Sequence, residues 1–179
     1  MKKRIFLVFV GVLATLVFAS WPFEVRSQSV PFIIERAKEK REALPFALKT
    51  VNGNQFTLAQ FKGKPVMLTF WATWCGSCTE EIPVIEKFSA GKRDQVTMLT
   101  MAIDGEKESR IRRFVDRKKI TLPVLLDAKE VTARSYGITM IPTTLFIDRN
   151  GFIIGMVRGE RDWSSPDAWP AIKNLFSLN

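Results

Sequence analysis

Continuous apolar runs alternate with amphipathic segments along most of this chain. The runs at 65–71 (PVMLTFW) and 96–103 (VTMLTMAI) contain no charged residue. Strands that are buried on both faces have this pattern. The first run is followed at a short distance by Ile82, Ile85 and Phe88, whose spacing is typical of one face of a helix. Helices between buried strands predict an α/β sheet that is covered on both faces.

Shorter segments complete the expected order of elements. Alternating residues on either side of Asn52-Gly53 predict a β-hairpin over 46–58. The segment 109–119 (SRIRRFVDRKK) has apolar residues at helical spacing and charges elsewhere, which predicts an amphipathic helix. We further expect a strand at 122–127, a short helix at 130–137, a pair of strands on either side of 149–151 and a closing helix at 165–176.

The first 23 residues read as a membrane-targeting segment. Lys2, Lys3 and Arg4 precede an uncharged, almost wholly apolar stretch at 5–23. About 20 such residues can cross a bilayer as a helix, and the cations should stay on the cytoplasmic side. The alternative is a signal peptide cleaved after Ala19. Both interpretations predict export, either at the cytoplasmic membrane with the domain facing the periplasm or outside, or as a soluble secreted or periplasmic protein.

The remainder divides into a tether and a domain. Residues 24–44 are polar and charged, and "ERAKEKREAL" within them could form a short exposed helix or a simple linker. The domain proper is expected to cover residues 45–179.

Composition excludes several kinds of site. The chain has no histidine, so it cannot build a Ser-His-Asp or Cys-His triad or a zinc site with histidine ligands. Its two cysteines cannot form a four-cysteine zinc site either. We therefore expect no metal and no cofactor other than the cysteine pair itself.

The formal net charge is +9, and the densest basic run lies at 110–119. The basic residues are not interleaved with aromatic ones, as a nucleic-acid surface would require. A solvated helix face explains the run most simply. The alternative is attraction to an anionic membrane surface or to an acidic partner.

Cys75 and Cys78 are separated by two residues and directly precede the helical pattern. A helix N-terminus carries partial positive charge and unpaired N–H groups, which should stabilise a thiolate at Cys75. Cys78, one turn further, could then attack a mixed disulfide formed on Cys75. An inert disulfide or a metal site is the alternative, but a bridge that closes so short a loop adds little stability.

The segments "FWATWCGSC" at 70–78 and "IPTTLFIDRNG" at 141–151, with Pro83 between them, resemble the thioredoxin superfamily. The similarity is closest to the exported thiol-disulfide oxidoreductases of the TlpA, ResA and DsbE type. It implies a thioredoxin-like α/β fold, in which a central mixed sheet is flanked by helices and carries an N-terminal hairpin and a central insertion at 104–127. It also implies a cis Ile141–Pro142 bond that faces the disulfide.

The resemblance implies a binding surface as well. The backbone of Ile141, next to Pro142, would pair with an extended substrate segment. Trp74 would contact the substrate, although ordinary aromatic packing is an equally good explanation for it and for Trp71.

The sequence departs from thioredoxin at two positions near the cysteines. Thr69 stands where thioredoxin has a buried aspartate, and it cannot accept a proton at neutral pH. The ResA-like branch has a glutamate three residues after the second cysteine, which matches Glu81, so we expect Glu81 to be the proton acceptor for Cys78. A surface glutamate is the alternative. Ser77 replaces a proline found in many relatives and could hydrogen-bond the sulfur of Cys75.

These residues predict a membrane-tethered or exported enzyme that reduces disulfides in exported apoproteins, including those of cytochrome c maturation. Its partners would be protein thiols and disulfides, a membrane thiol donor and the membrane itself, but not nucleic acid. The chain has no haem-attachment motif, so any haem would belong to a partner. The alternatives are a disulfide oxidant or isomerase, a redoxin-type peroxidase and a binding module without activity.

Overall fold

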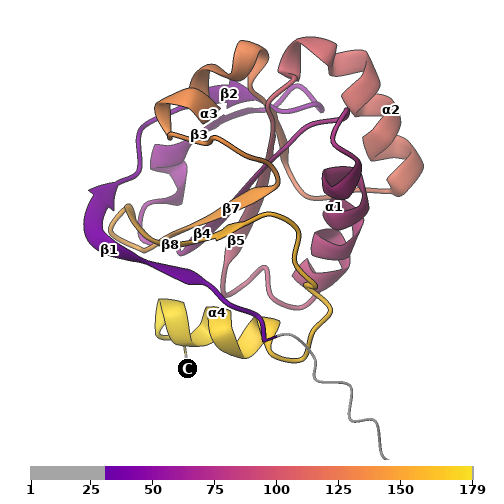
Figure 1. Ribbon diagram of the computed structural model, residues 1–179. Coiled ribbons are helices and arrows are strands. Elements are labelled where there is room, and N and C mark those ends of the chain that lie inside the picture. The colour runs from indigo at the N-terminus through magenta and orange to yellow at the C-terminus, as the bar shows by residue number, and fades with distance from the viewer. Residues whose placement is uncertain (1–30, 179) are drawn as a thin grey trace, which may run out of the picture.

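The apolar run that follows Pro65 forms the central strand β4 (Val66–Trp71), in which every residue is buried. The computed structural model describes residues 31–178, and β4 lies in the middle of a six-stranded sheet with the order β1-β8-β7-β4-β5-β6 (Figure 1). This strand has hydrogen-bonded neighbours on both sides and is covered on both faces. For this reason polar and apolar residues do not alternate along it.

The sheet is mixed, as the resemblance to the thioredoxin superfamily implied. β4 pairs in parallel with β5 (Thr97–Ala102), which pairs in parallel with β6 (Val124–Leu126). On its other side β4 pairs antiparallel with β7 (Thr143–Ile147), which continues into β8 (Phe152–Arg158). The three parallel strands therefore end at the same edge of the sheet, and the cysteine-containing loop leaves β4 there.

Three helices cover one face of the sheet. In Figure 1 α1 and α2 lie at the right, and α4 lies below the sheet toward the lower left. They are α1 (Gly76–Ser89), α2 (Glu108–Lys118) and α4 (Ala168–Phe176). On this face Trp71 of β4 packs against Phe114 of α2, with ring centroids 4.9 Å apart. Phe146 of β7 packs against Phe176 of α4 at 5.9 Å.

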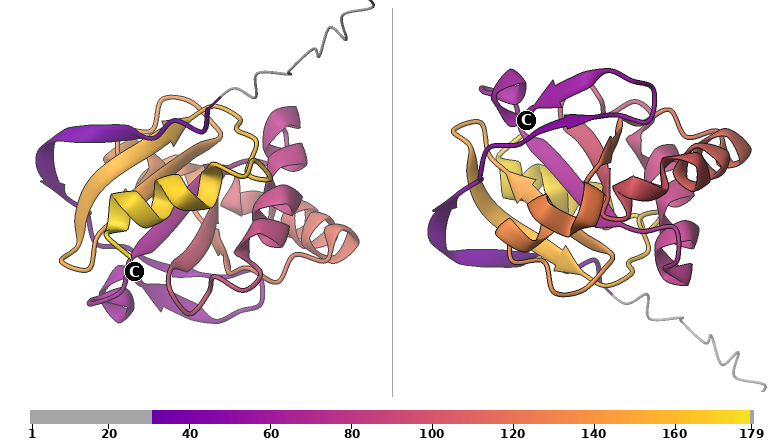
Figure 2. Two further views of the ribbon diagram at one scale, coloured as in Figure 1. Left: turned by 90° about the horizontal axis from the view of Figure 1, so that it is seen from below. Right: turned by 90° about the horizontal axis from the view of Figure 1, so that it is seen from above.

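The short helix α3 (Val131–Ser135) covers the opposite face of the sheet, and Figure 2 shows it from above. Tyr136, the residue after α3, lies 5.8 Å from Phe70 between ring centroids. Phe70 and Trp71 are adjacent in β4 and point to opposite faces, so the two contacts place α3 and α2 on different sides.

The predicted hairpin is present as β2 (Ala47–Lys49) and β3 (Gln55–Thr57), which pair antiparallel. Gly53 has a φ of +86°, a conformation that glycine adopts without steric cost. Short 3₁₀ turns occupy Leu58–Phe61, Gly105–Lys107 and Ala128–Glu130.

The expectation that residues 24–44 form a helix or a tether is wrong for Glu35–Glu42. This segment is strand β1, which pairs antiparallel with β8 at the edge of the sheet. Its side chains are almost all exposed, so the strand is held by backbone pairing and shows no apolar alternation. Phe32 and Ala43, at its two ends, are buried in the core. The packed domain therefore begins well before Pro45.

The predicted anchor or signal peptide at 1–23 lies outside the described residues. Within residues 31–178, none of the helices combines the length and the apolar character that crossing a bilayer requires.

Candidate active site

The two cysteines lie where β4 passes into α1. Cys75 is the N-cap residue of α1, with extended backbone angles, and the Cys78 N–H donates a hydrogen bond to its sulfur over 3.2 Å. The first N–H groups of a helix have no partner within the helix, so a sulfur at the N-cap satisfies one of them. The same arrangement stabilises negative charge on the Cys75 sulfur when the pair is reduced.

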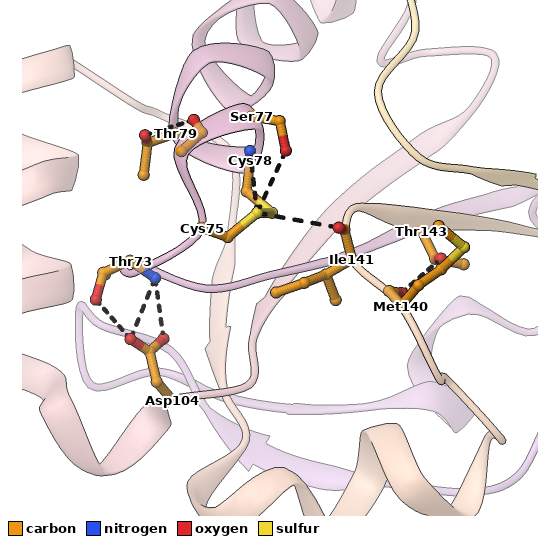
Figure 3. The surroundings of a disulfide bond; sticks show 10 residues. Thr73, Cys75, Ser77, Cys78, Thr79, Asp104, Met140, Ile141 and Thr143 are labelled. Atoms are coloured by element: carbon orange, nitrogen blue, oxygen red, sulfur yellow. Dashed lines mark hydrogen bonds between the residues drawn. A yellow bond between two sulfur atoms is a disulfide. The ribbon is translucent and has the colours of Figure 1, made fainter.

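Cys75 and Cys78 form a disulfide, as Figure 3 shows. The two residues differ in accessibility, because Cys75 is 9% exposed and Cys78 is fully buried. A partner molecule can therefore reach the Cys75 sulfur more readily than the Cys78 sulfur.

The loop before β7 faces this disulfide. The carbonyl oxygen of Ile141 lies 4.0 Å from the Cys75 sulfur, and the Ile141–Pro142 peptide bond is cis, as predicted. Met140 precedes it with 48% of its surface exposed, and its carbonyl accepts a hydrogen bond from the Thr143 hydroxyl (Figure 3). The structure thus brings Ile141 and Pro142 to the sulfur, next to an exposed apolar side chain.

The two tryptophans of the motif have different surroundings. Trp74 is 62% exposed and adjoins Cys75 in the chain, so it is available to a partner. Trp71 is fully buried and packs against Phe114. Trp71 therefore belongs to the core. Ser77, as expected, reaches the active cysteine, with its hydroxyl oxygen 3.5 Å from the Cys75 sulfur.

Glu81 is a buried residue, only 3% exposed, and lies on α1 one turn after Cys78. This spacing puts the two side chains on the same face of the helix. One carboxylate oxygen, Oε1, accepts hydrogen bonds from the backbone N–H of Arg161 at 2.9 Å and from the indole N–H of Trp163 at 2.8 Å. The interpretation of Glu81 as a surface residue is wrong.

Burial raises the pKa of the Glu81 carboxyl above its ordinary value, and the hydrogen bonds from Trp163 and Arg161 oppose that rise only in part. The charges of Glu160 and Arg161 have smaller, opposite effects. A carboxyl whose pKa is shifted toward neutral is a better match for exchanging protons with a thiol.

Two residues at the site, Trp163 and Asp104, were not predicted from the sequence to belong to it. Trp163 is buried and lies 82 residues after Glu81, in a loop without a periodic pattern. Asp104, two residues after the end of β5, accepts hydrogen bonds from the backbone N–H and the hydroxyl of Thr73, which holds the loop before Cys75 (Figure 3). Its position after a buried strand, at the edge where the parallel strands end, was the available signal.

Thr69 occupies the strand position at which thioredoxin has an aspartate. It is buried, and its hydroxyl oxygen lies 2.8 Å from that of Thr144 on the neighbouring strand. Thr69 therefore supplies no carboxylate under the disulfide, which leaves Glu81 as the buried carboxyl on the helix that carries both cysteines.

Comparisons with known proteins agree with this geometry. The profile of the AhpC/TSA family matches residues 40–156. The thioredoxin-like protein YneN of Bacillus subtilis is 36% identical over 118 residues, which cover 65% of this chain and 69% of the relative. The thiol-disulfide oxidoreductase ResA of Halalkalibacterium halodurans is 32% identical over 123 residues, which cover 69% of this chain and 70% of the relative.

A solved structure described as a putative thiol:disulfide interchange protein DsbE from Chlorobium tepidum superimposes with a TM-score of 0.69. It is 27% identical, and the match covers 77% of this chain and 97% of that one. The chain therefore belongs to the AhpC/TSA family of thioredoxin-like proteins, and it is a thiol-disulfide oxidoreductase of the ResA and DsbE type.

Proposed function

We propose that the protein is an exported, membrane-tethered reductant of disulfides in exported apoproteins, with cytochrome c maturation as the process it serves. The unequal burial of the two cysteine residues carries this proposal. The accessible cysteine sits at the N-cap of α1, where its thiolate is stabilised, and the buried one lies one turn away. This order suits an attacking and a resolving thiol.

The reaction transfers two electrons. The Cys75 thiolate attacks one sulfur of the substrate disulfide, forming a mixed disulfide and releasing the first substrate thiolate. The Cys78 thiolate then attacks the Cys75 sulfur, which releases the second substrate thiolate and leaves the Cys75–Cys78 disulfide. A dithiol donor, which we place in the membrane, reduces the pair again. The cycle needs no cofactor besides the two cysteines.

Glu81 is the proton acceptor for Cys78 in this proposal. Cys78 must lose its proton before it can attack, and it is buried away from water. Glu81 is on the same face of α1, and burial raises the pKa of its carboxyl, which makes it a better proton acceptor than an exposed glutamate.

Ile141, Pro142 and Trp74 form the substrate surface. An extended segment could pair with the backbone of Ile141, which lies beside the Cys75 sulfur, while the exposed side chains of Trp74 and Met140 offer apolar contact. Export is supported by the cationic start and apolar stretch at 2–23.

Trapping of partners tests this function. The full-length Cys78→Ala variant should retain partners as mixed disulfides on Cys75 when expressed in cells that export it. Mass spectrometry should identify exported proteins with cysteine pairs, such as apocytochromes c, and a membrane thiol protein. The Cys75→Ala variant is the control and should capture none. Equal capture by both variants would contradict the assignment of Cys75 as the attacking residue.

A further inference from the structure

A groove of about 600 Å³ runs between α1 and α2, and most of its charged side chains are basic. The charged residues that line it are Arg110, Arg113, Arg117 and Lys118 from α2 and Glu80 from α1. Four cations therefore face a single carboxylate in a channel that is open to solvent.

The arginines form one row along α2. Arg110, Arg113 and Arg117 follow at intervals of three and four residues, which puts them on the same side of the helix. All three are exposed, and among the described residues none of them is paired with a carboxylate. Arg112, which does not line the groove, pairs with Glu108 at 2.7 Å. Like charges at this spacing destabilise a helix unless an anion lies between them.

The groove ends beside the loop that leads to the active site. Thr73 lines it and is two residues before Cys75, while Thr79 lines it from the first turns of α1. The N-terminus of α1 adds its own partial positive charge at this end. A partner that places an acidic segment in the groove would have to extend past this loop to bring its disulfide to the Cys75 sulfur, which faces Ile141.

We propose that this groove binds acidic side chains that flank the reactive cysteine of the protein partner. The inference rests on the proposed function, because it assigns a charge preference to the same substrate. Arg110 and Arg117 are seven positions apart on α2, which is about 10 Å along the helix axis and matches the length of about three residues of an extended chain. The row of cations could therefore face carboxylates that follow one another along a peptide. The row thus selects partners by electrostatic attraction before thiol exchange begins.

The test compares two peptides that contain the same internal disulfide. One has aspartate and glutamate on both sides of its cysteines, and the other has serine and glutamine there. The reduced full-length protein, in a neutral detergent, is mixed with each peptide and with 2-hydroxyethyl disulfide, which is small and uncharged. Second-order rate constants are measured at low and high salt for the wild type and for three variants. Two of these change the groove: the single variant Arg113→Gln and the triple variant Arg110→Gln/Arg113→Gln/Arg117→Gln. The third, Arg112→Gln, is the matched control because Arg112 does not line the groove.

We expect the wild type to reduce the acidic peptide about tenfold faster than the neutral one at low salt, with the difference fading at about 0.5 M salt. Arg113→Gln should reduce this preference about threefold and the triple variant should remove it, whereas Arg112→Gln should leave it nearly intact. An unchanged rate with 2-hydroxyethyl disulfide shows that each variant is folded and that its cysteines are intact.

Equal rates for the two peptides in the wild type, with normal reduction of 2-hydroxyethyl disulfide, would overturn the acidic-partner inference and leave the proposed function standing. The basic row would then have to serve another anion, such as a lipid headgroup. An equal loss of preference in Arg112→Gln and Arg113→Gln would overturn it too, because the effect would be one of net charge alone. Failure to reduce any of the three disulfides would refute the proposed function, and the inference with it.

Discussion

The indole N–H of Trp163 donates a hydrogen bond to Oε1 of Glu81 over 2.8 Å, although 82 residues separate the two in the chain. Both side chains are buried. The contact connects the loop before α4 to the helix that carries Cys75 and Cys78, and it partly offsets the effect of burial on the Glu81 carboxyl.

Replacing Glu81 by glutamine should slow the resolving step of disulfide exchange. Glutamine keeps the shape and the acceptor oxygen but cannot take the proton of Cys78. We expect the release of product from a preformed mixed disulfide to slow by about tenfold to a hundredfold at pH 7. Rapid mixing followed by acid quench measures this step, and exposed Glu39→Gln is the control. A rate and pH profile equal to those of the wild type from pH 5 to 9 would remove Glu81 from the mechanism.

Replacing Trp163 by phenylalanine should move the pH profile of exchange. The variant loses the N–H that stabilises the ionised carboxylate, so the pKa of Glu81 rises further above its ordinary value. The pH at which the rate is half-maximal should shift upward in Trp163→Phe and not in Glu81→Gln/Trp163→Phe. An equal shift in both would assign the effect to packing.

Glu81 should also make stability depend on pH. Its folded-state pKa is raised above the unfolded value near 4.5, so the folded protein binds more protons between these two values. The contribution of Glu81 to stability is complete below pH 4.5 and is lost as the pH rises through the folded pKa. Glu81→Gln should therefore become more stable relative to the wild type as the pH increases, which urea unfolding at several pH values can measure. If the unfolding free energies of the two proteins changed with pH in the same way, the raised pKa of Glu81 would be contradicted.

Glu86 should have the opposite dependence. Its carboxylate accepts hydrogen bonds from Thr121 and Leu122, joining α1 to the loop before β6, and it pairs with Arg93 at 2.6 Å. Burial raises its pKa, but these hydrogen bonds and the Arg93 charge outweigh burial, so the net pKa lies below 4.5.

Glu86→Gln should therefore cost about 1–3 kcal/mol of unfolding free energy at pH 7. The difference from the wild type should shrink as the pH falls below 4.5 through the folded pKa. Urea unfolding measures it, with Glu39→Gln as the control. If the loss of unfolding free energy in Glu86→Gln stayed constant down to pH 3, the negative charge of Glu86 would play no part in it.

Phe32 should stabilise the fold and also hold Trp163, the hydrogen-bond partner of Glu81, in position. It is buried, and its ring packs edge-on against Trp163 with centroids 5.0 Å apart. Phe32→Ala should lower the unfolding free energy by about 2–4 kcal/mol. Exposed Ile33→Ala is the matched control and should cost well under 1 kcal/mol. Similar costs for both would mean that the segment before β1 is not packed in solution.

The buried parts of the fold were predictable because their signal is local. Val66–Trp71 and Thr97–Ala102 are apolar throughout since both faces of each strand are covered, and the periodicity of Ile82, Ile85 and Phe88 follows from one face of α1. β1 was not predictable in this way, because an edge strand with exposed side chains is held by its backbone. Its charged residues are typical of edges that must not pair with other chains.

At the candidate site, too, local features could be predicted and features that depend on distant residues could not. The pairing of Cys75 with Cys78 and the cis Ile141–Pro142 bond followed from motifs that a family resemblance makes specific. The burial of Glu81 did not, because its cause is a partner 82 residues away, in a loop that has no helical or strand periodicity.

The reduction potential of the Cys75–Cys78 pair tests the central claim most directly. The full-length protein is equilibrated in graded thiol/disulfide buffers, and its thiols are alkylated and counted by mass, which is unambiguous because the chain has only two cysteines. We predict a potential near or below about −220 mV, on the reducing side of the range of thioredoxin-like proteins. A value near about −120 mV would make the protein an oxidant and contradict the proposed role in reducing exported apoproteins.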